Sequence, residues 1–311
     1  VSECRVPSGD RGLRPASAVY LGYRTIFLKA LQLKMSGRYV FLLAAVAAHK
    51  VVVEVVCQSR CPDCQRTVLG PLREVVEDPA MAEFIDLRFY PWGNAYFATQ
   101  QCGGAPYAAT KRQCWYDYCH VESPPEDCYT GAVVPQHAEP ERTVDRRVGC
   151  GIHLQASWQK HWPYVECMYN ATHTLDKANH KEIGTVSLLR MAELTIAAEA
   201  CATTHGFDSN SIEACASGED GDAVQHRFAK ATPKHPGTPT LVVNGKQVVM
   251  DYDNPPVPNL YSEICQAADH KPAPCASRAM IDLNGKHWRR ASQRRAMKLG
   301  HRRKHHHVKA H

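Results

Sequence analysis

Val51-Val52-Val53-Glu54-Val55-Val56 precedes Cys61-Pro62-Asp63-Cys64, and a stretch with apolar residues at helical spacing follows over residues 65–77. The nearly continuous apolar run predicts a strand buried on both faces, and the later spacing predicts a helix that Gly70-Pro71 would kink. Cysteines at a helix N-terminus suit redox chemistry, because free N–H groups and the positive end of the helix dipole favour a thiolate. The pattern therefore predicts a redox pair, with a structural disulfide and half of a zinc site as alternatives.

Cysteine content points to an oxidising compartment. The 311 residues include fourteen cysteines, most of which glutathione would keep reduced in the cytosol. Their scatter shows no repeated zinc-binding pairs, so we expect mostly disulfides. The sequon Asn170-Ala171-Thr172 predicts glycosylation and agrees with passage through the secretory pathway. The cysteines are residues 4, 57, 61, 64, 102, 114, 119, 128, 150, 167, 201, 215, 265 and 275.

Charge is distributed unevenly along the chain. Residues 276–311 hold eleven Lys and Arg residues against one acidic residue, and residues 1–50 hold eight against two. Residues 51–275 hold eighteen basic and twenty-eight acidic residues, so this part of the chain is acidic. An acidic body argues against a nucleic-acid-binding core.

Both ends differ from the central part. Residues 1–34 are expected to be a disordered upstream or leader segment. Residues 35–48 combine a basic residue, a short apolar stretch and terminal small residues, which predicts a signal peptide cleaved near Ala47 or Ala48; a buried helix or strand is the alternative. The apolar stretch is about half of the ~20 residues that a spanning helix needs, so no stable membrane span is predicted. Residues 276–311 form a basic, His-rich tail that we expect to be disordered.

Residues 100–150 look like a disulfide-stapled insertion, because five cysteines lie there among Gly, Pro and polar residues. With five, at least one must pair outside the insertion or stay free. A zinc site from Cys114, Cys119 and His120 is an alternative, but no second ligand pair has suitable spacing, so no metal is predicted. Residues 182–200 have the periodicity of an amphipathic helix, after which Cys201 and Cys215 can bond to each other or across the helices.

Later segments complete an α/β plan. Residues 85–90 alternate as a second strand, and residues 238–249 predict a hairpin with Asn244-Gly245 at its turn. Residues 260–268 predict a closing helix. In thioredoxin-like folds a cis-proline precedes the corresponding hairpin strand and faces the redox pair, a place that Pro239 would fill; an ordinary trans-proline is the alternative. We therefore expect a thioredoxin-like fold over residues 49–275, with a helical and cysteine-rich insertion.

Taken in order, these motifs resemble the gamma-interferon-inducible lysosomal thiol reductase family over about residues 51–275. The family signature begins Cys-Gln-His-Gly, which this chain lacks: the nearest upstream cysteine is Cys150, and Trp162 follows His161. The resemblance rests on the strand, Cys-x-x-Cys and helix, Pro91-Trp92-Gly93-Asn94-Ala95, Glu166-Cys167-x-x-Asn170, the spacing around Cys201 and Cys215, the Pro239 hairpin, and Cys265-Gln266 followed by Lys271-Pro272 and Cys275.

The resemblance implies a secretory-pathway thiol reductase that acts on disulfide-bonded protein substrates, in an acidic endosome or lysosome or outside the cell. Cys61 would attack and Cys64 would resolve the mixed disulfide. A small thiol would supply electrons, and no cofactor is implied. Thr238 and Pro239 would bind the substrate backbone. The implied structural cysteines are Cys167, Cys201, Cys215, Cys265 and Cys275. The alternative function is a secreted thioredoxin-like binding domain with a structural Cys61–Cys64 disulfide and no catalysis.

An acidic compartment demands a reactive Cys61. A free cysteine has a pKa of about 8.5 and is almost wholly protonated at acidic pH. The helix N-terminus, Arg60 and Arg66 therefore predict a pKa of Cys61 well below the ordinary value, although Asp63 opposes this shift. Cys57 is close enough in sequence to regulate the pair or to bond elsewhere, and the sequence does not choose between these roles.

Overall fold

The computed structural model describes residues 26–35, 38–47, 49–178, 188–248, 260–269 and 275. The chain divides into two units, Val1–His49 and Lys50–His311. In the first unit, β1 (Ile26–Met35) and β2 (Arg38–Ala47) pair in antiparallel register, with Ile26 opposite Ala47. β1 overlaps the expected leader segment and β2 lies within the expected signal peptide, whose cleavage stays a prediction. The basic tail after Cys275 lies outside the described residues.

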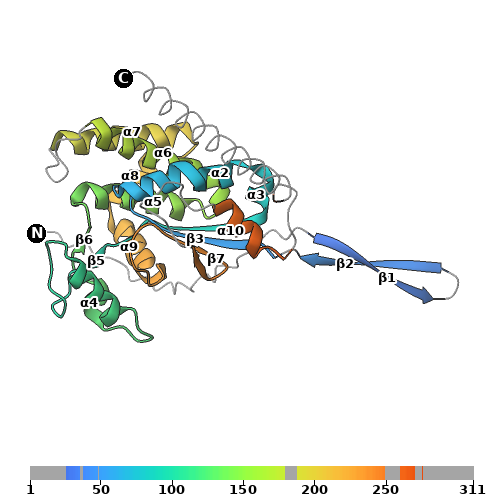
Figure 1. Cartoon of the computed structure of the whole chain (residues 1–311). Coiled ribbons are helices and arrows are strands. Elements are labelled where there is room, and N and C mark those ends of the chain that lie inside the picture. Colours follow the sequence, from blue (N-terminus) through green and yellow to red (C-terminus); the bar gives the residue numbers. More distant parts are fainter. Residues whose placement is uncertain are drawn as a thin grey trace, which may run out of the picture. The chain divides into compact units, whose positions relative to one another are not determined.

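The second unit is built on a four-stranded sheet in the order β4-β3-β7-β8, of which Figure 1 labels β3 and β7. The central strand β3 (Val51–Val56) runs parallel to β4 (Ile85–Tyr90) and antiparallel to β7 (Thr240–Val243). β8 (Lys246–Val248) pairs with β7 at the edge. Val51, Val53 and Val55 are fully buried, whereas Val52 and Glu54 on the other face are only partly covered.

Local sequence explains the β7–β8 hairpin, and two helices cover the sheet. Asn244 and Gly245 link β7 to β8 with φ values of 46° and 78°, the left-handed conformation that an Asn-Gly turn supplies. The closing helix α10 (Leu260–Ala267) packs on β3 and β7, and α6 (Trp158–Ala178) packs on β4. A strand, a helix, a parallel strand, an antiparallel hairpin and a closing helix form the predicted thioredoxin-like fold, which is thereby confirmed.

A helix follows Cys61 as predicted, but its central turn is wider than an α-helix. α1 (Pro62–Thr67) leads through a π-helical turn (Val68–Leu72) into α2 (Arg73–Glu77), and α3 (Pro79–Phe84) follows. Pro71 lies inside the π-helical turn. Because proline has no N–H to donate and its ring crowds the carbonyl one turn back, a wider turn accommodates it where a regular helix would not.

The helical insertion lies between β4 and β7. Its centre is α5, which packs against α6, α8 and α9, and α7 packs on α6 (Figure 1). The expected helix over 182–200 appears, in its described part, as α7 and continues beyond Cys201. The remaining elements are β5 (Tyr96–Phe97), α4 (Ala109–Cys119), a 3-10 turn (Glu126–Tyr129), β6 (Val133–Val134), α5 (Glu139–Leu154), α7 (Leu188–Thr204), α8 (Ser209–Ser217) and α9 (Glu219–Ala231).

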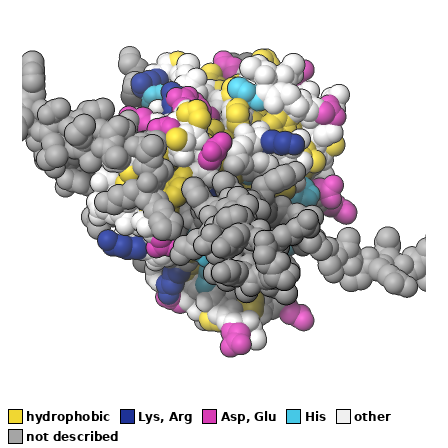
Figure 2. Space-filling view, turned by 90° about the vertical axis from the view of Figure 1, so that its right-hand side faces the viewer, with side chains coloured by type: hydrophobic (Ala, Val, Ile, Leu, Met, Phe, Trp, Pro, Cys, Tyr) yellow, Lys and Arg dark blue, Asp and Glu magenta, His cyan; other side chains and the backbone are white. Residues whose placement is uncertain are grey.

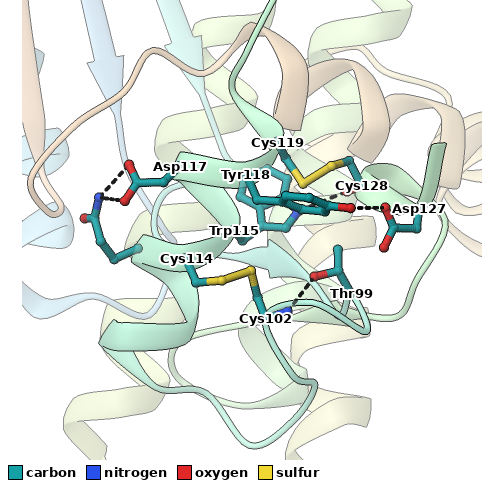
Figure 3. The surroundings of a disulfide bond; sticks show 10 residues. Thr99, Cys102, Cys114, Trp115, Asp117, Tyr118, Cys119, Asp127 and Cys128 are labelled. Atoms are coloured by element: carbon teal, nitrogen blue, oxygen red, sulfur yellow. Dashed lines mark hydrogen bonds between the residues drawn. A yellow bond between two sulfur atoms is a disulfide. The ribbon is translucent and has the colours of Figure 1, made fainter. Parts of the chain in front are cut away.

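In the described part of the chain, four disulfides lie within the insertion, and a fifth joins the closing helix to Cys275. Two of them flank the buried Trp115 on α4, whose Nε1 donates to the Cys128 carbonyl at 2.9 Å (Figure 3). Cys114 and Cys119 are both bonded, so they cannot act as thiolate ligands of the alternative zinc site. The pairs are Cys102–Cys114, Cys119–Cys128, Cys150–Cys215, Cys167–Cys201 and Cys265–Cys275.

The pairing resolves questions that spacing left open. Of the five cysteines in residues 100–150, Cys150 is the one that pairs outside that stretch, and it joins α5 to α8 through Cys215. Cys201 bonds across the helices to Cys167, and not to Cys215. All five cysteines with an implied structural role are therefore in disulfides.

Removing the Cys150–Cys215 bond should destabilise the fold strongly. It closes a separation of 65 residues, for which loop-closure entropy gives about 4 kcal/mol of stability. Cys102–Cys114 closes only 12 residues, for which the same relation gives about 3 kcal/mol. Urea unfolding of the two double-alanine variants should show the larger loss in Cys150→Ala/Cys215→Ala. Equal losses would mean that the chain-entropy term does not control their contributions.

The described surface carries mixed chemistry. Acidic and basic side chains lie interspersed with apolar ones over the face drawn in Figure 2. Within the described part of the chain, no helix combines the length and the apolar composition needed to cross a bilayer.

Candidate active site

The Cys61–Cys64 pair occupies the N-terminal end of α1. Cys61 is the N-cap residue, Pro62 opens the helix, and the Gln65 backbone N–H donates to the Cys61 carbonyl at 2.9 Å. Proline suits the first helical position because its missing N–H has no partner there in any case. Cys64 is fully buried, whereas Cys61 is 7% exposed. Both cysteines are free thiols here, as is Cys57.

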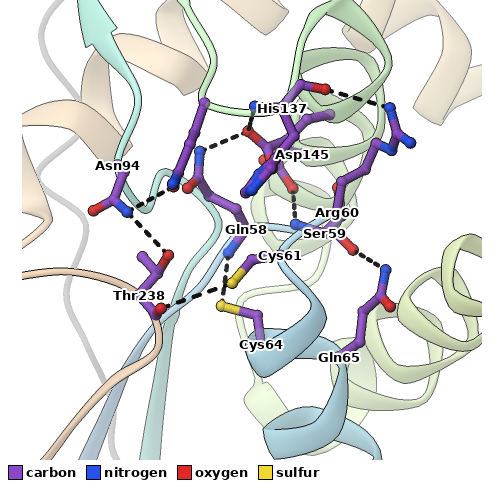
Figure 4. Close-up of polar contacts among 12 residues, drawn as sticks. Gln58, Ser59, Arg60, Cys61, Cys64, Gln65, Asn94, His137, Asp145 and Thr238 are labelled. Atoms are coloured by element: carbon purple, nitrogen blue, oxygen red, sulfur yellow. Dashed lines mark hydrogen bonds and ion pairs between the residues drawn. The ribbon is translucent and has the colours of Figure 1, made fainter. Parts of the chain in front are cut away.

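Three segments that are distant in sequence meet at Cys61 (Figure 4). Its thiol donates to the Thr238 carbonyl at 3.7 Å, and the Thr238–Pro239 peptide bond is cis. Asn94, from the motif that follows β4, donates through Nδ2 to Thr238 Oγ1 at 3.1 Å and to Gln136 Oε1 at 2.7 Å. The two residues expected to bind substrate backbone therefore lie beside the expected attacking thiol.

The loop before Cys61 is held by carboxylates that sequence reasoning missed. Gln58 Nε2 donates to Glu141 Oε1 at 2.8 Å, and the Ser59 backbone N–H donates to Asp145 Oδ1 at 2.9 Å (Figure 4). Arg60 donates through Nε and Nη2 to Asp176 Oδ1 at 3.1 and 2.9 Å. Three consecutive loop residues thus each pair with a different acid from α5 or α6.

A weak sequence signal for this arrangement exists. Glu141 and Asp145 are four residues apart, so they share one face of α5 with the buried Val144 and Val148. Carboxylates on an apolar helical face need buried partners. The spacing of residues does not show that the loop before Cys61 covers this face of α5. For that reason the charged residues hid the amphipathic pattern of the helix.

The carboxylates also alter nearby titrations. His137 Nδ1 lies 2.5 Å from Glu141 Oε2, and the His137 backbone N–H donates to Glu141 Oε1 at 3.0 Å. Burial disfavours a charged His137, but the hydrogen bond and the charge of Glu141 outweigh it and raise the pKa of His137. Burial, together with the nearby Glu141 charge, raises the pKa of Asp145. A negative charge on Cys61 acts in the same upward direction on the pKa of His137.

The predicted lowering of the pKa of Cys61 is wrong for this reduced state. The hydrogen bond with the Cys64 side chain, followed by burial, raises the pKa of Cys61 above the ordinary thiol value. The Cys64 backbone N–H at the helix end lowers it, but by less. Neither neighbouring guanidinium is unpaired, because Arg60 binds Asp176 and Arg66 binds Asp63.

Removing the Cys64 side chain should make Cys61 more acidic. In Cys64→Ala the largest cause of the raised pKa is absent, so the alkylation rate of Cys61 should rise at lower pH than in the parent. Cys64→Ser keeps a hydroxyl that can hydrogen-bond to Cys61 and serves as the matched variant. Iodoacetamide labelling against pH, read at the peptide that contains Cys61, measures this shift. Unchanged profiles in Cys64→Ala would contradict the assigned cause.

The predicted glycosylation site lies on helix α6. Asn170 is exposed on α6 and lines a cleft of about 610 Å³, together with Trp158, Trp162 and Arg73. Thr172 of the same sequon is buried, and its hydroxyl donates to the Met168 carbonyl at 2.8 Å.

Comparison with known proteins agrees with the site. The family model described as "Gamma interferon inducible lysosomal thiol reductase (GILT)" matches residues 52–121, which include Cys61, Cys64 and Asn94. No curated protein matches the chain. Among solved structures, the oxidoreductase DsbA from Xylella fastidiosa is similar at 16% identity and a TM-score of 0.34, over 66% of this chain and 78% of that chain. Residues 52–121, which contain both cysteines of the pair, are thus similar to the gamma interferon inducible lysosomal thiol reductase family, and this similarity supports an oxidoreductase that acts on disulfide bonds.

Proposed function

We propose that the protein reduces disulfides of protein substrates through Cys61 and Cys64, in an acidic endosomal or lysosomal compartment. One observation carries the proposal: Cys61 caps the N-terminus of α1, Cys64 lies in the first turn of that helix, and the Thr238 carbonyl lies beside the Cys61 sulfur. An extended substrate that pairs with the backbone at Thr238 and Pro239 would bring its disulfide to Cys61.

The chemistry proceeds by two exchanges. The Cys61 thiolate attacks one sulfur of the substrate disulfide, forms a mixed disulfide, and releases the other substrate sulfur as a thiolate that takes up a proton. Cys64 then attacks the Cys61 sulfur, forms the Cys61–Cys64 bond, and releases the second substrate thiol. Two molecules of a small thiol return the pair to its reduced state.

Several features support the compartment. Five disulfides fit an oxidising route of synthesis. The sequon at Asn170 and the signal-peptide pattern over 35–48 fit the same route, and the matched family is named for the lysosome. At acidic pH a protonated His137 also supplies a cation that favours the Cys61 thiolate, since the charges of the two groups attract.

A second candidate is a binding domain whose Cys61–Cys64 bond is structural. Cys61 is only 7% exposed and its pKa is raised, and both properties make a poor nucleophile. Catalysis requires Cys61 to react with an external disulfide, whereas the binding domain requires only that the bond stay closed. Reactivity therefore separates the two functions.

Turnover at two pH values tests the proposal. A denatured, disulfide-bonded protein should be reduced in the presence of a small thiol at about pH 5 as well as at about pH 7, although the thiolate fraction of Cys61 is smaller at the lower pH. Activity confined to neutral pH would contradict the acidic compartment but not the chemistry. Inactivity at both values, with a folded protein, would favour the binding domain.

Glycosylation tests the secretory route independently. Expression in a eukaryotic secretory system should give a chain whose mass falls after endoglycosidase treatment, and Asn170→Gln should abolish that change. Because Thr172 is buried in α6, the glycan would have to be added before this helix folds. A parent chain that the enzyme leaves unchanged would contradict glycosylation.

A further inference from the structure

Cys57 is a thiol that the proposed chemistry does not use. It directly follows β3 and is fully buried. Its backbone N–H donates to the Tyr90 carbonyl at 3.2 Å, which fixes its position against the end of β4. Ten of the thirteen cysteines in the described part of the chain form disulfides, and Cys57 remains a thiol with Cys61 and Cys64.

The Cys64 thiol is a neighbour of the other two thiols. It shifts the pKa of both Cys57 and Cys61, and each of them shifts the pKa of Cys64 through space. The Gln58 backbone N–H, one residue beyond Cys57, donates to Cys64 Sγ at 3.3 Å. The end of strand β3 and the first turn of α1 therefore place the two fully buried thiols Cys57 and Cys64 next to each other, and exchange between them needs no external group.

We propose that Cys57 is a third redox-active thiol, which exchanges with the Cys61–Cys64 disulfide to form a buried Cys57–Cys64 bond. This inference rests on the proposed function, because that function supplies the Cys61–Cys64 disulfide. The Cys57 thiolate attacks Cys64 Sγ, the Cys57–Cys64 bond forms, and the Cys61–Cys64 bond breaks. Cys61 leaves as a thiolate and takes up the proton that Cys57 lost, so no external oxidant or reductant is consumed.

The exchange returns Cys61 to the thiol form while the enzyme stays oxidised. After it, the oxidising equivalents lie between two fully buried sulfurs, and Cys61 is again a thiol beside Thr238. An oxidised enzyme could then form a second mixed disulfide at Cys61, which a two-cysteine enzyme cannot do.

Tryptic cleavage after Lys50, Arg60 and Arg66 separates the possible bonds cleanly. Cys57 falls in the peptide 51–60, and Cys61 and Cys64 fall together in 61–66. A Cys61–Cys64 bond is therefore a loop within one peptide, whereas any bond to Cys57 joins two peptides. Cys61→Ser removes the ambiguity, because the joined peptides then contain only Cys57 and Cys64.

The experiment oxidises folded Cys61→Ser with oxidised glutathione, blocks remaining thiols with N-ethylmaleimide at acid pH, and maps the peptides by mass spectrometry. Both free thiols should be lost, with 51–60 joined to 61–66. The matched variant Cys57→Ala/Cys61→Ser should keep Cys64 without any such link. In the oxidised wild-type chain, a fraction of Cys61 should accept the maleimide, and Cys57→Ala should abolish that fraction.

The inference would be overturned if Cys57 and Cys64 were recovered without a bond between them in Cys61→Ser. The conditions must be ones that oxidise the wild-type Cys61–Cys64 pair. If Cys61→Ser loses its native circular dichroism, the joined peptides and Cys61 labelling in the wild-type chain decide the same question. Failure of the proposed function would appear differently, as the absence of turnover in a folded wild-type chain, whether or not the 61–66 loop forms.

Discussion

Replacing Cys61 with serine is expected to lower the rate of protein disulfide reduction at least about 100-fold, to the background of the small thiol. A serine hydroxyl cannot form the mixed disulfide, and Cys64 is fully buried and cannot replace it as the attacking group. The assay is reduction of a denatured, disulfide-bonded protein at about pH 5. Substantial remaining activity would move the attacking role to another cysteine.

Replacing Cys64 with serine should instead trap the intermediate. Cys61 can still attack, but the group that releases the substrate is absent, so a covalent complex between enzyme and substrate should accumulate on non-reducing gels. Cys61→Ser/Cys64→Ser should form no complex and is the matched control. A complex in the double variant would show that another cysteine is reacting. Rapid turnover by Cys64→Ser would point to resolution by Cys57.

The second large effect is on stability, at Glu141. Glu141→Leu should lower the free energy of unfolding by about 3–5 kcal/mol, the range for removing one member of a buried charged pair. The carboxylate is fully buried and accepts hydrogen bonds from Gln58 Nε2 and from the His137 backbone N–H, besides pairing with the His137 ring. Leucine would leave all of these groups unpaired. Urea unfolding at neutral pH measures the loss.

Glu141→Gln is the matched variant. Its side-chain oxygen can still accept from Gln58 and from the His137 backbone, so a loss of about 1–2 kcal/mol is expected. This variant should also retain more reductase activity than Glu141→Leu, because Gln58 belongs to the loop that positions Cys61. Equal stability of the two variants would mean that the hydrogen bonds to Glu141 contribute little.

The insertion between β4 and β7 contains a helix that apolar periodicity did not predict. Residues 139–154 form α5, although charged residues and two glycines interrupt their apolar pattern. Gly151 lies so close to α6 that an added Cβ would come 2.5 Å from the Tyr164 ring. The glycine thus permits close helix packing. That requirement depends on a partner helix, and a single stretch of sequence carries no record of it.

The Cys61 environment shows the same limit at the level of chemistry. The position of Cys61 at a helix N-terminus was predictable from the sequence. So was the fact that this end of a helix lowers the pKa of a thiol. The hydrogen bond with the Cys64 side chain and the burial of Cys61 come from three-dimensional neighbours, and together they reverse the net direction of the pKa shift.

By itself, the sequence determined the strand, cysteine pair and helix over residues 51–77, the Asn244-Gly245 hairpin and the place of Pro239. These features depend on residue spacing and local backbone preferences, which act over a few residues. Only the tertiary structure decided the disulfide partners, the carboxylates that hold residues 58–60 and the placement of Cys64 next to the end of β3, beside Cys57. Those depend on burial and on contacts between distant segments, because a charge or a thiol acquires its chemistry from whatever the folded chain packs around it.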